Sequence, residues 1–346
     1  MFKLLFFVLL FAKTPKIKIG VNVPLTGPVA SYGKYCLEGI KLGALDHPEI
    51  ELVIKDNEGR AENTVIILRR FVKEGVIAVI GPIISSNAIV AGLEASELGI
   101  PLILPAATNT AITKVSHFLF RGCYTDEQQG KALADFSYHS LGKMEVSIIA
   151  DTSNIYSGGL ALYFKREFEN LDGTAQFIKW DGKSDLTEHL QKLANGTIFL
   201  PLYYEDVVPI IKSSRAQNLN ITFLGADGWD VPELFQVLQE DTGNLYFSTH
   251  YFMTESIQEF TELYKEKYGK DPNAFSSLGF DAINLLLFAI SEAEGLRPGD
   301  VQNSLSNITT FEGVTGSFKY DHKRDPIKDI FILRLQKGKL FLMERR

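Results

Sequence analysis

The chain has 346 residues, of which 45% are hydrophobic and 22% are charged, and its formal net charge at pH 7 is -7. This length predicts two packed domains, and the composition excludes a chain that is disordered as a whole. The negative charge is spread along the sequence, which argues against a nucleic-acid-binding face.

The N-terminus has the features of a secretory signal. Lys3 is followed by an apolar run over 4–12, which is too short to span a bilayer. Residues 1–13 are therefore predicted to be a signal peptide, and the mature protein is expected in the periplasm or another extracytoplasmic space, without stable insertion into a membrane. A start that is not cleaved is the alternative, because Leu10 is large for a cleavage site.

The first half of the chain alternates between predicted strands and helices. In chain order these are a strand at 16–23, a helix at 33–46, a strand at 51–56, a helix at 61–74, a strand at 76–80, a helix at 86–98 and a strand at 101–104. Short apolar strands that alternate with helices indicate a parallel sheet covered by helices.

The same alternation restarts near residue 126. Its predicted elements are a helix at 126–141, a strand at 145–150, a helix at 157–170, a strand at 175–180, a helix at 184–194, a strand at 197–200, a helix at 205–218 and a strand at 221–224. The rest contains predicted helices at 256–268 and 274–294 and strands at 318–320 and 330–341. These last pieces are too few for a core of their own, so we expect them to pack back on both arrays. A chain that crosses between two lobes several times forms a hinge.

Motifs of the common enzyme classes are missing from the sequence. It has no G-x-G-x-x-G after the first strand, no Walker lysine motif, no G-x-S-x-G and no H-E-x-x-H. Cys36 and Cys123 form neither a C-x-x-C pair nor a zinc spacing; buried thiols are expected, with a disulfide left open. The sequence therefore predicts no catalytic residue, no cofactor and no metal.

Polar residues follow two strands of the first array, and ligands of open α/β sheets bind outside such strand ends. The segment 80–87 leads into a helix, where Ser85, free N–H groups and the positive end of the helix dipole can hold a carboxylate. Ser86 is expected only to cap that helix. The turn 105–109 offers backbone groups and the Thr108 hydroxyl to an ammonium or a carboxylate, with a purely structural turn as the alternative.

Asp227 follows the last strand of the second array, in a glycine-rich turn. A desolvated carboxylate at this place can pair with a ligand ammonium. Capping of the next helix is one alternative, and a catalytic base in an α/β enzyme is another. Aromatic residues at strand ends or helix starts are placed to wall a pocket, or else belong to the core: Tyr32, Tyr156, Tyr203 and Phe275.

Five segments, taken in order, resemble the branched-chain amino-acid-binding proteins, which are periplasmic receptors of ABC importers. They are Pro-Leu-Thr-Gly-Pro-Val-Ala-Ser-Tyr-Gly at 24–33, Ile-Gly-Pro-Ile-Ile-Ser-Ser at 80–86, Pro-Ala-Ala-Thr at 105–108, Gly-Ala-Asp-Gly-Trp at 225–229 and Gly-Phe-Asp-Ala-Ile at 279–283. The resemblance implies a type I periplasmic-binding-protein fold, an α/β fold of two Rossmann-like lobes joined by a three-crossover hinge. The lobes are predicted to comprise 14–124 with 251–327, and 125–250 with 328–346.

The resemblance also implies a role for each candidate residue. The positions that hold the α-carboxylate and α-ammonium from the first lobe are matched by Ser85, Ala106 and Thr108. The positions that close over the ligand from the second lobe are matched by Tyr156 and Tyr203, and those near its side chain by Tyr32 and Phe275. Asp227 matches an acidic position, often Glu, that pairs with the ammonium; its shorter side chain brings the ammonium closer or requires a water. Ile84 stands where leucine-binding members have a disulfide-forming Cys.

The function implied by this resemblance is the capture of a small amino acid by closure of the two lobes. A branched-chain or other hydrophobic amino acid is expected, and the partner is an ABC transporter permease. The alternative is a ligand sensor of the same fold that regulates a protein partner and binds an amide, urea or an aromatic acid.

Overall fold

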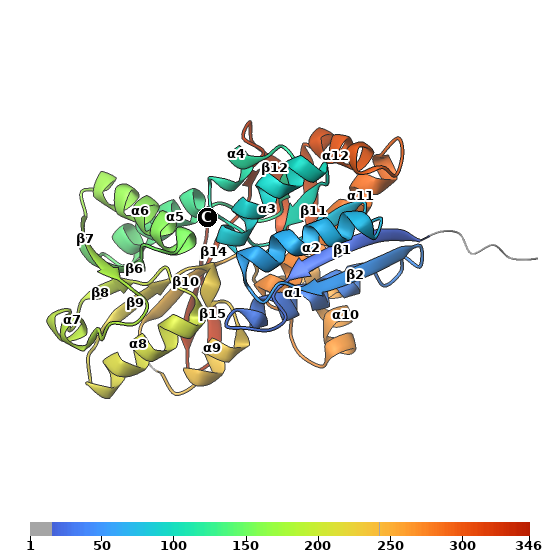
Figure 1. Ribbon diagram of the computed structural model, residues 1–346. Helices are drawn as coiled ribbons and strands as arrows, with labels where there is room; N and C mark the ends of the chain where they lie inside the picture. The colour runs from blue at the N-terminus through green and yellow to red at the C-terminus, as the bar shows by residue number, and fades with distance from the viewer. Residues whose placement is uncertain (1–15, 242) are drawn as a thin grey trace, which may run out of the picture.

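The computed structural model describes residues 16–241 and 243–346, and it consists of two α/β lobes that lie side by side (Figure 1). The first lobe is built on a five-stranded sheet and the second on a seven-stranded sheet. A small three-stranded sheet accompanies the first lobe. The predicted signal peptide, 1–13, lies outside the described residues.

The first lobe contains five parallel strands in the order β2-β1-β3-β4-β5. They are β1 (Ile17–Val23), β2 (Ile50–Asp56), β3 (Ala78–Ile80), β4 (Leu102–Leu104) and β5 (Leu119–Arg121). The central strands are runs of buried apolar residues, because helices cover both faces of a parallel sheet. The sequence did not predict β5, whose short apolar run ends in the charged residue Arg121.

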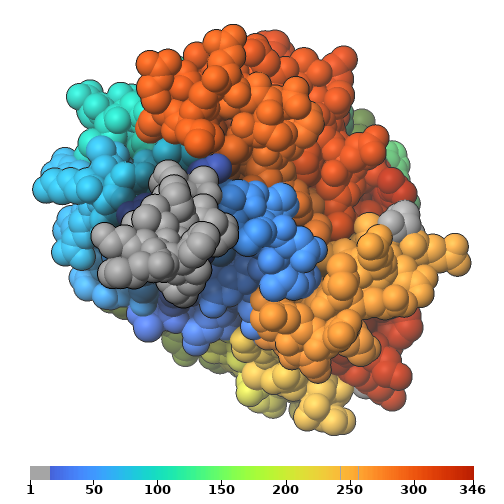
Figure 2. Space-filling model, turned by 90° about the vertical axis from the view of Figure 1, so that its right-hand side faces the viewer, coloured from blue at the N-terminus to red at the C-terminus, as the bar shows by residue number. Residues whose placement is uncertain are grey.

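The helices of the first lobe come from both ends of the chain. They are α1 (Ala30–Gly43), α2 (Ala61–Lys73), α3 (Ser85–Leu98), α4 (Ile112–Val115), η3 (Glu255–Ile257), α10 (Gln258–Tyr268), α11 (Ala274–Glu292) and α12 (Pro298–Asn307). The small sheet comprises β11 (Thr310–Gly313), β12 (Gly316–Tyr320) and β13 (Pro326–Ile327). In Figure 2, orange α10 lies near the blue N-terminal part of the chain, where the Tyr268 hydroxyl donates to the Glu38 carbonyl at 2.9 Å.

Helices α1 and α11 pack with their backbones in close approach. A Cβ atom added at Gly39 would lie 1.8 Å from the Ser276 carbonyl oxygen, and one added at Gly279 would lie 2.1 Å from the Cys36 carbonyl oxygen. Only glycine permits this approach at either position. By length and composition α11 could cross a membrane, and among the described residues it is alone in this, but most of it is buried inside the lobe.

The second lobe contains seven strands in the order β15-β14-β10-β9-β8-β6-β7. They are β6 (Glu145–Asp151), β7 (Thr174–Trp180), β8 (Thr197–Phe199), β9 (Thr222–Gly225), β10 (Leu245–Thr249), β14 (Phe331–Gln336) and β15 (Lys339–Arg345). Strands β6 to β10 pair in parallel, whereas β14 and β15 are antiparallel additions at one edge. The helices are α5 (Asp126–Asp135), η1 (Phe136–Ser140), α6 (Ile155–Asn170), α7 (Thr187–Lys192), α8 (Tyr204–Ala216), η2 (Asp227–Trp229) and α9 (Pro232–Val237).

The chain crosses between the lobes after β5, after β10 and after β13. These crossovers contact one another. The ring of Tyr124 on the first stacks on that of His250 on the second, with centroids 3.5 Å apart, and Lys328 on the third donates to the Gly122 carbonyl at 3.2 Å. Three adjoining connections of this kind form a hinge. The finer lobe boundaries stay a prediction: 14–124 with 251–327, and 125–250 with 328–346.

Candidate ligand-binding site

Ser85 is the first residue of α3, and its side chain is buried at the carboxyl end of the first sheet. Its Oγ accepts a hydrogen bond from the backbone N–H of Asn109 at 3.4 Å, which connects the two loops that follow β3 and β4. The predicted capping role of Ser86 is wrong. Ile84 occupies the cap position in an extended conformation, without a side-chain cap, and Ser86 lies exposed inside the first turn. The first N–H groups of α3 therefore lack a side-chain cap and are available to an anion.

The loop after β4 is held rigidly by a buried cation. Arg121 donates from Nη1 to the Ala107 carbonyl at 3.2 Å and from Nη2 to the Asn109 carbonyl at 2.9 Å, and its Nε lies 3.1 Å from Asp325. Ala106 and Thr108, both predicted site residues, are buried in this loop. The Thr108 hydroxyl is buried close to the Asp126 carboxyl, whose pKa it lowers.

Asp227 begins η2, directly after β9, and is buried at the inner face of the second lobe. Its Oδ1 accepts a hydrogen bond from the Tyr156 hydroxyl at 2.8 Å, and its Oδ2 lies 3.4 Å from His250 Nε2. Within the described residues, His250 is the basic side chain at ion-pair distance from this carboxylate. Burial lowers the pKa of His250 to about 4, although Asp227 opposes that shift, so the imidazole is neutral at pH 7. In the described part of the chain, the carboxylate therefore has no charged base at ion-pair distance.

A second carboxylate, Asp126, belongs to the same site, and the sequence analysis missed it. It is the first residue of α5 and is fully buried; its Oδ1 accepts from Gln129 Nε2 at 3.1 Å. The nearby Thr108 hydroxyl also interacts with this carboxyl. Burial, together with the charge of Asp227, raises the pKa of Asp126 to about 7. An acidic residue in the first turn of a helix is common, so no local pattern set this one apart.

Gln129 connects these two acidic groups. Its Oε1 accepts from the Ser248 hydroxyl at 3.0 Å and lies 3.5 Å from the backbone nitrogen of Asp227, while its Nε2 donates to Asp126. On the other side, the Thr108 carbonyl accepts from the backbone N–H of Asp126 at 2.9 Å. A continuous set of contacts therefore runs from the first-lobe loop to Asp227.

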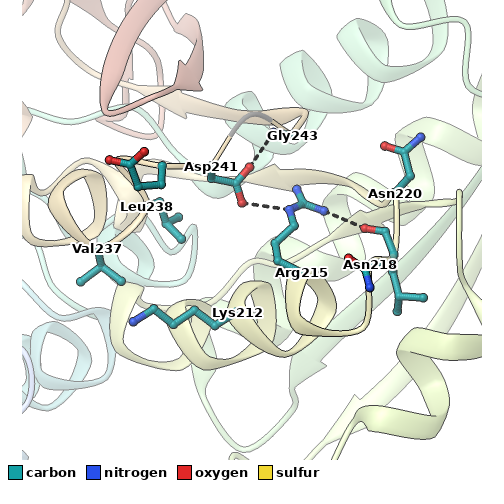
Figure 3. A pocket seen from close by; sticks show the side chains of 10 residues that line it. Lys212, Arg215, Asn218, Asn220, Val237, Leu238, Asp241 and Gly243 are labelled. Atoms are coloured by element: carbon teal, nitrogen blue, oxygen red, sulfur yellow. Dashed lines mark hydrogen bonds and ion pairs between the residues drawn. The ribbon is translucent and has the colours of Figure 1, made fainter.

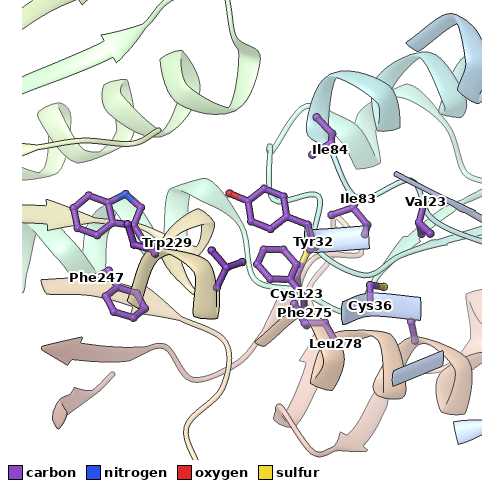
Figure 4. Packing of buried hydrophobic residues seen from close by; sticks show 14 of the residues in the cluster. Val23, Tyr32, Cys36, Ile83, Ile84, Cys123, Trp229, Phe247, Phe275 and Leu278 are labelled. Carbon is purple, nitrogen blue, oxygen red and sulfur yellow. The ribbon is translucent and has the colours of Figure 1, made fainter. Parts of the chain in front are cut away.

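The predicted aromatic residues form one continuous wall. Tyr156 stacks on Tyr203 with centroids 5.0 Å apart, Tyr203 contacts Tyr32 at 5.7 Å, and Tyr32 stacks on Phe275 at 4.4 Å. Figure 4 shows Tyr32 and Phe275 among the buried residues of the first lobe, with Trp229 of the second lobe beyond them. The structure thus brings the predicted aromatic residues together beside Asp227. Their roles toward a ligand remain predictions.

Both cysteines are free and buried. Burial raises the pKa of both thiols, that of Cys123 to about 12, so neither is a reactive thiolate at neutral pH. The 550 Å³ cavity in Figure 3 lies elsewhere, on the outer part of the second lobe, where Arg215 binds Asp241 at 2.9 Å between α8 and the end of α9. None of the predicted site residues lines it.

Two lobes on parallel sheets, joined by three crossovers and meeting at polar and aromatic side chains, define a two-lobed solute-binding protein. The chain belongs to the periplasmic binding protein family, whose model matches residues 16–339. The predicted family and fold class are thereby confirmed.

Relatives in this family include several that are named for branched-chain amino acids. A leucine-binding protein, LivK, from Thermotoga maritima MSB8 is 30% identical, with a TM-score of 0.89, over 95% of this chain and 98% of that one. LivJ from Streptococcus pneumoniae, solved in complex with isoleucine, is 27% identical with a TM-score of 0.87, over 96% and 99% of the two chains. Leu/Ile/Val-binding protein homolog 1 of Brucella abortus (strain 2308) is 25% identical over 90% of this chain and 87% of its own length.

Proposed function

We propose that the protein is the solute-binding receptor of an ABC importer and that it captures an α-amino acid with an apolar side chain between its lobes. The observation that carries this proposal is the buried pair of carboxylates, Asp227 and Asp126, beside a neutral His250. Among the described residues Asp227 has no charged base at ion-pair distance, and because an unpaired buried carboxylate is costly, the site calls for a cationic ligand group. An α-ammonium satisfies it, with the Thr108 hydroxyl as a further partner.

The carboxylate end of the same ligand is assigned to the first lobe. Ser85, the uncapped N–H groups of α3 and the backbone at Ala106 offer hydrogen-bond donors to an anion without an arginine or lysine. An amino acid therefore lies with its ammonium toward the acidic pair and its carboxylate toward α3. This orientation uses both charged ends of a zwitterion.

The aromatic wall defines the side-chain end. Tyr32, Phe275 and Tyr203 present mostly apolar surface, and burial raises the pKa of Tyr32, which keeps its hydroxyl neutral. The printed names of the relatives, for leucine, isoleucine and valine, agree with an apolar side chain. Tyr156 and Tyr203 come from the second lobe, so closure places them over the ligand.

In this proposal the protein binds and releases its ligand without changing it. Residues 1–13 direct export, the protein acts in an extracytoplasmic space, and the closed form delivers the amino acid to an ABC transporter permease. Membership of the periplasmic binding protein family supports this general role.

Isothermal titration calorimetry with the common amino acids tests the proposal. We expect leucine, isoleucine or valine to bind with a Kd on the order of micromolar or below. Asp227→Ala should weaken that binding by about 100-fold or more, since truncating one partner of a buried charge pair costs about 2–5 kcal/mol. Asp185→Ala, at an exposed position of the second lobe, serves as the matched control.

Two results contradict the proposal. One is unchanged amino-acid affinity in Asp227→Ala, which removes the ammonium assignment. The other is binding of benzoate, acetamide or urea without binding of any amino acid, which favours the sensor alternative and its different ligand class.

A further inference from the structure

The lobes contact each other at a place that lies outside the ligand site. Near the start of α1, Ser31 of the first lobe donates from Oγ to Glu233 Oε1 of α9 in the second lobe, at 2.8 Å. The Tyr35 hydroxyl, one helical turn further along α1, donates to the same carboxylate oxygen at 3.5 Å. Ser31 Oγ and the Tyr204 hydroxyl are also 3.3 Å apart. We refer to Ser31, Tyr35 and Glu233 as the rim latch.

The rim latch adjoins the proposed site without belonging to it. Tyr32 lies on α1 between the two donors of the latch, Ser31 and Tyr35. Its hydroxyl donates to the Gly228 carbonyl at 2.7 Å and accepts from the Tyr204 backbone N–H at 3.2 Å. Gly228 is the residue after Asp227. The same turn of α1 therefore contacts the proposed ammonium-binding loop through Tyr32 and α9 through the latch.

Opening of the lobes has to break these contacts, because their two sides belong to different sheets. Glu233 Oε1 would lose two donors at once, and its Oε2 has no hydrogen-bond partner within 16–241 and 243–346. Tyr35 is held in place by Lys270, whose Nζ lies 4.4 Å from the centre of its ring. The Tyr35 donor is thus fixed within the first lobe, and the bonds to Glu233 form only when α9 approaches α1.

We propose that Glu233 sets the rate at which the protein releases its ligand, as a positioning residue that contacts no ligand atom. This inference rests on the proposed function, since a captured amino acid leaves only when the lobes separate. Hydrogen bonds to a carboxylate that exist only in the closed form lower the frequency of opening. The effect falls on the dissociation rate, because the association rate depends on the open form.

The experiment measures leucine release by stopped-flow fluorescence, with excess unlabelled competitor, for the wild type and five variants. Glu233→Ala should raise the dissociation rate by about 10-fold or more, in line with the strength of hydrogen bonds to charged groups. Ser31→Ala should raise it less, because Tyr35 remains. The double variant should be at most slightly faster than Glu233→Ala alone, since both substitutions remove the Ser31–Glu233 bond and Ser31→Ala adds only the loss of the 3.3 Å contact with Tyr204. Glu240→Ala, another glutamate of the second lobe, should match the wild type.

A purely structural role of Glu233 would give a different result. The latch predicts an unchanged order of preference among amino acids, an unchanged melting temperature without ligand, and partial rescue by Glu233→Gln, whose amide oxygen still accepts from Ser31. Equal dissociation rates for Glu233→Ala and the wild type, or additive effects in the double variant, overturn the inference. If the wild type binds no amino acid in calorimetry, the proposed function itself fails, and the inference falls with it.

Discussion

Gly39→Ala should weaken the contact between α1 and α11, even though alanine is the better helix former. The new Cβ would lie 1.8 Å from the Ser276 carbonyl oxygen and 2.8 Å from the Phe280 backbone nitrogen. Real Cβ atoms essentially never come closer than 3.0 Å to such atoms, so the two helix backbones must separate. Overpacking costs about 1–3 kcal/mol, and a clash with backbone belongs at the upper end. The higher helix propensity of alanine offsets about 1 kcal/mol of this cost, so the free energy of unfolding should fall by about 2 kcal/mol.

Urea unfolding and thermal melting measure this loss, and Gly299→Ala is the matched control. Gly299 also lies in a helix, but a Cβ there meets nothing within 4 Å, so its substitution should be neutral or stabilise by up to about 1 kcal/mol. Because α1 carries Tyr32 and the Ser31 and Tyr35 donors of the rim latch, Gly39→Ala should also weaken leucine binding. A Gly39→Ala protein as stable as the wild type, or one no less stable than Gly299→Ala, would refute the reasoning.

Two further predictions concern buried charges. Burial raises the pKa of Asp230 to about 7, so the free energy of unfolding should fall as the pH rises from about 4 to above 7. Asp230→Asn should flatten that fall in thermal melts across this range, and equal slopes for both proteins would contradict the assignment. Arg121→Lys should destabilise the protein by about 3 kcal/mol and weaken leucine binding, because a lysine cannot make the three contacts that hold the loop after β4. Urea unfolding and calorimetry check this, and wild-type values for both would show that the loop does not depend on Arg121.

The sequence predicted most of the fold because its signals are local. Strands such as β1 and β3 are short apolar runs, and the helices between them show clear periods. β10 was missed although it is central to its sheet: it ends in Ser248 and Thr249, whose hydroxyls are satisfied by Gln129 and by Asp230. Partners more than a hundred residues away, such as Gln129, leave no periodic pattern to detect.

The site could be predicted only in part for the same reason. Asp227 and Thr108 follow strands, so the rule for strand ends found them. Asp126 and His250 lie at or beside crossovers, and only the packing of the hinge makes one a buried carboxylate and the other a neutral imidazole. Ser86 does not cap α3 because the helix begins at Ser85, one residue earlier than the sequence predicted, and Ile84 occupies the cap position.

The two antiparallel strands at the end of the chain have a consequence for biogenesis. β14 lies between β10 and β15, so the second sheet lacks two of its strands until residues 331–345 are present. The first lobe in turn needs α11, which follows the whole parallel part of the second sheet. Neither lobe can therefore complete its core until the last residues of the chain have been synthesised. A C-terminal truncation before β14 would leave the edge of β10 unpaired, which is a surface prone to aggregation.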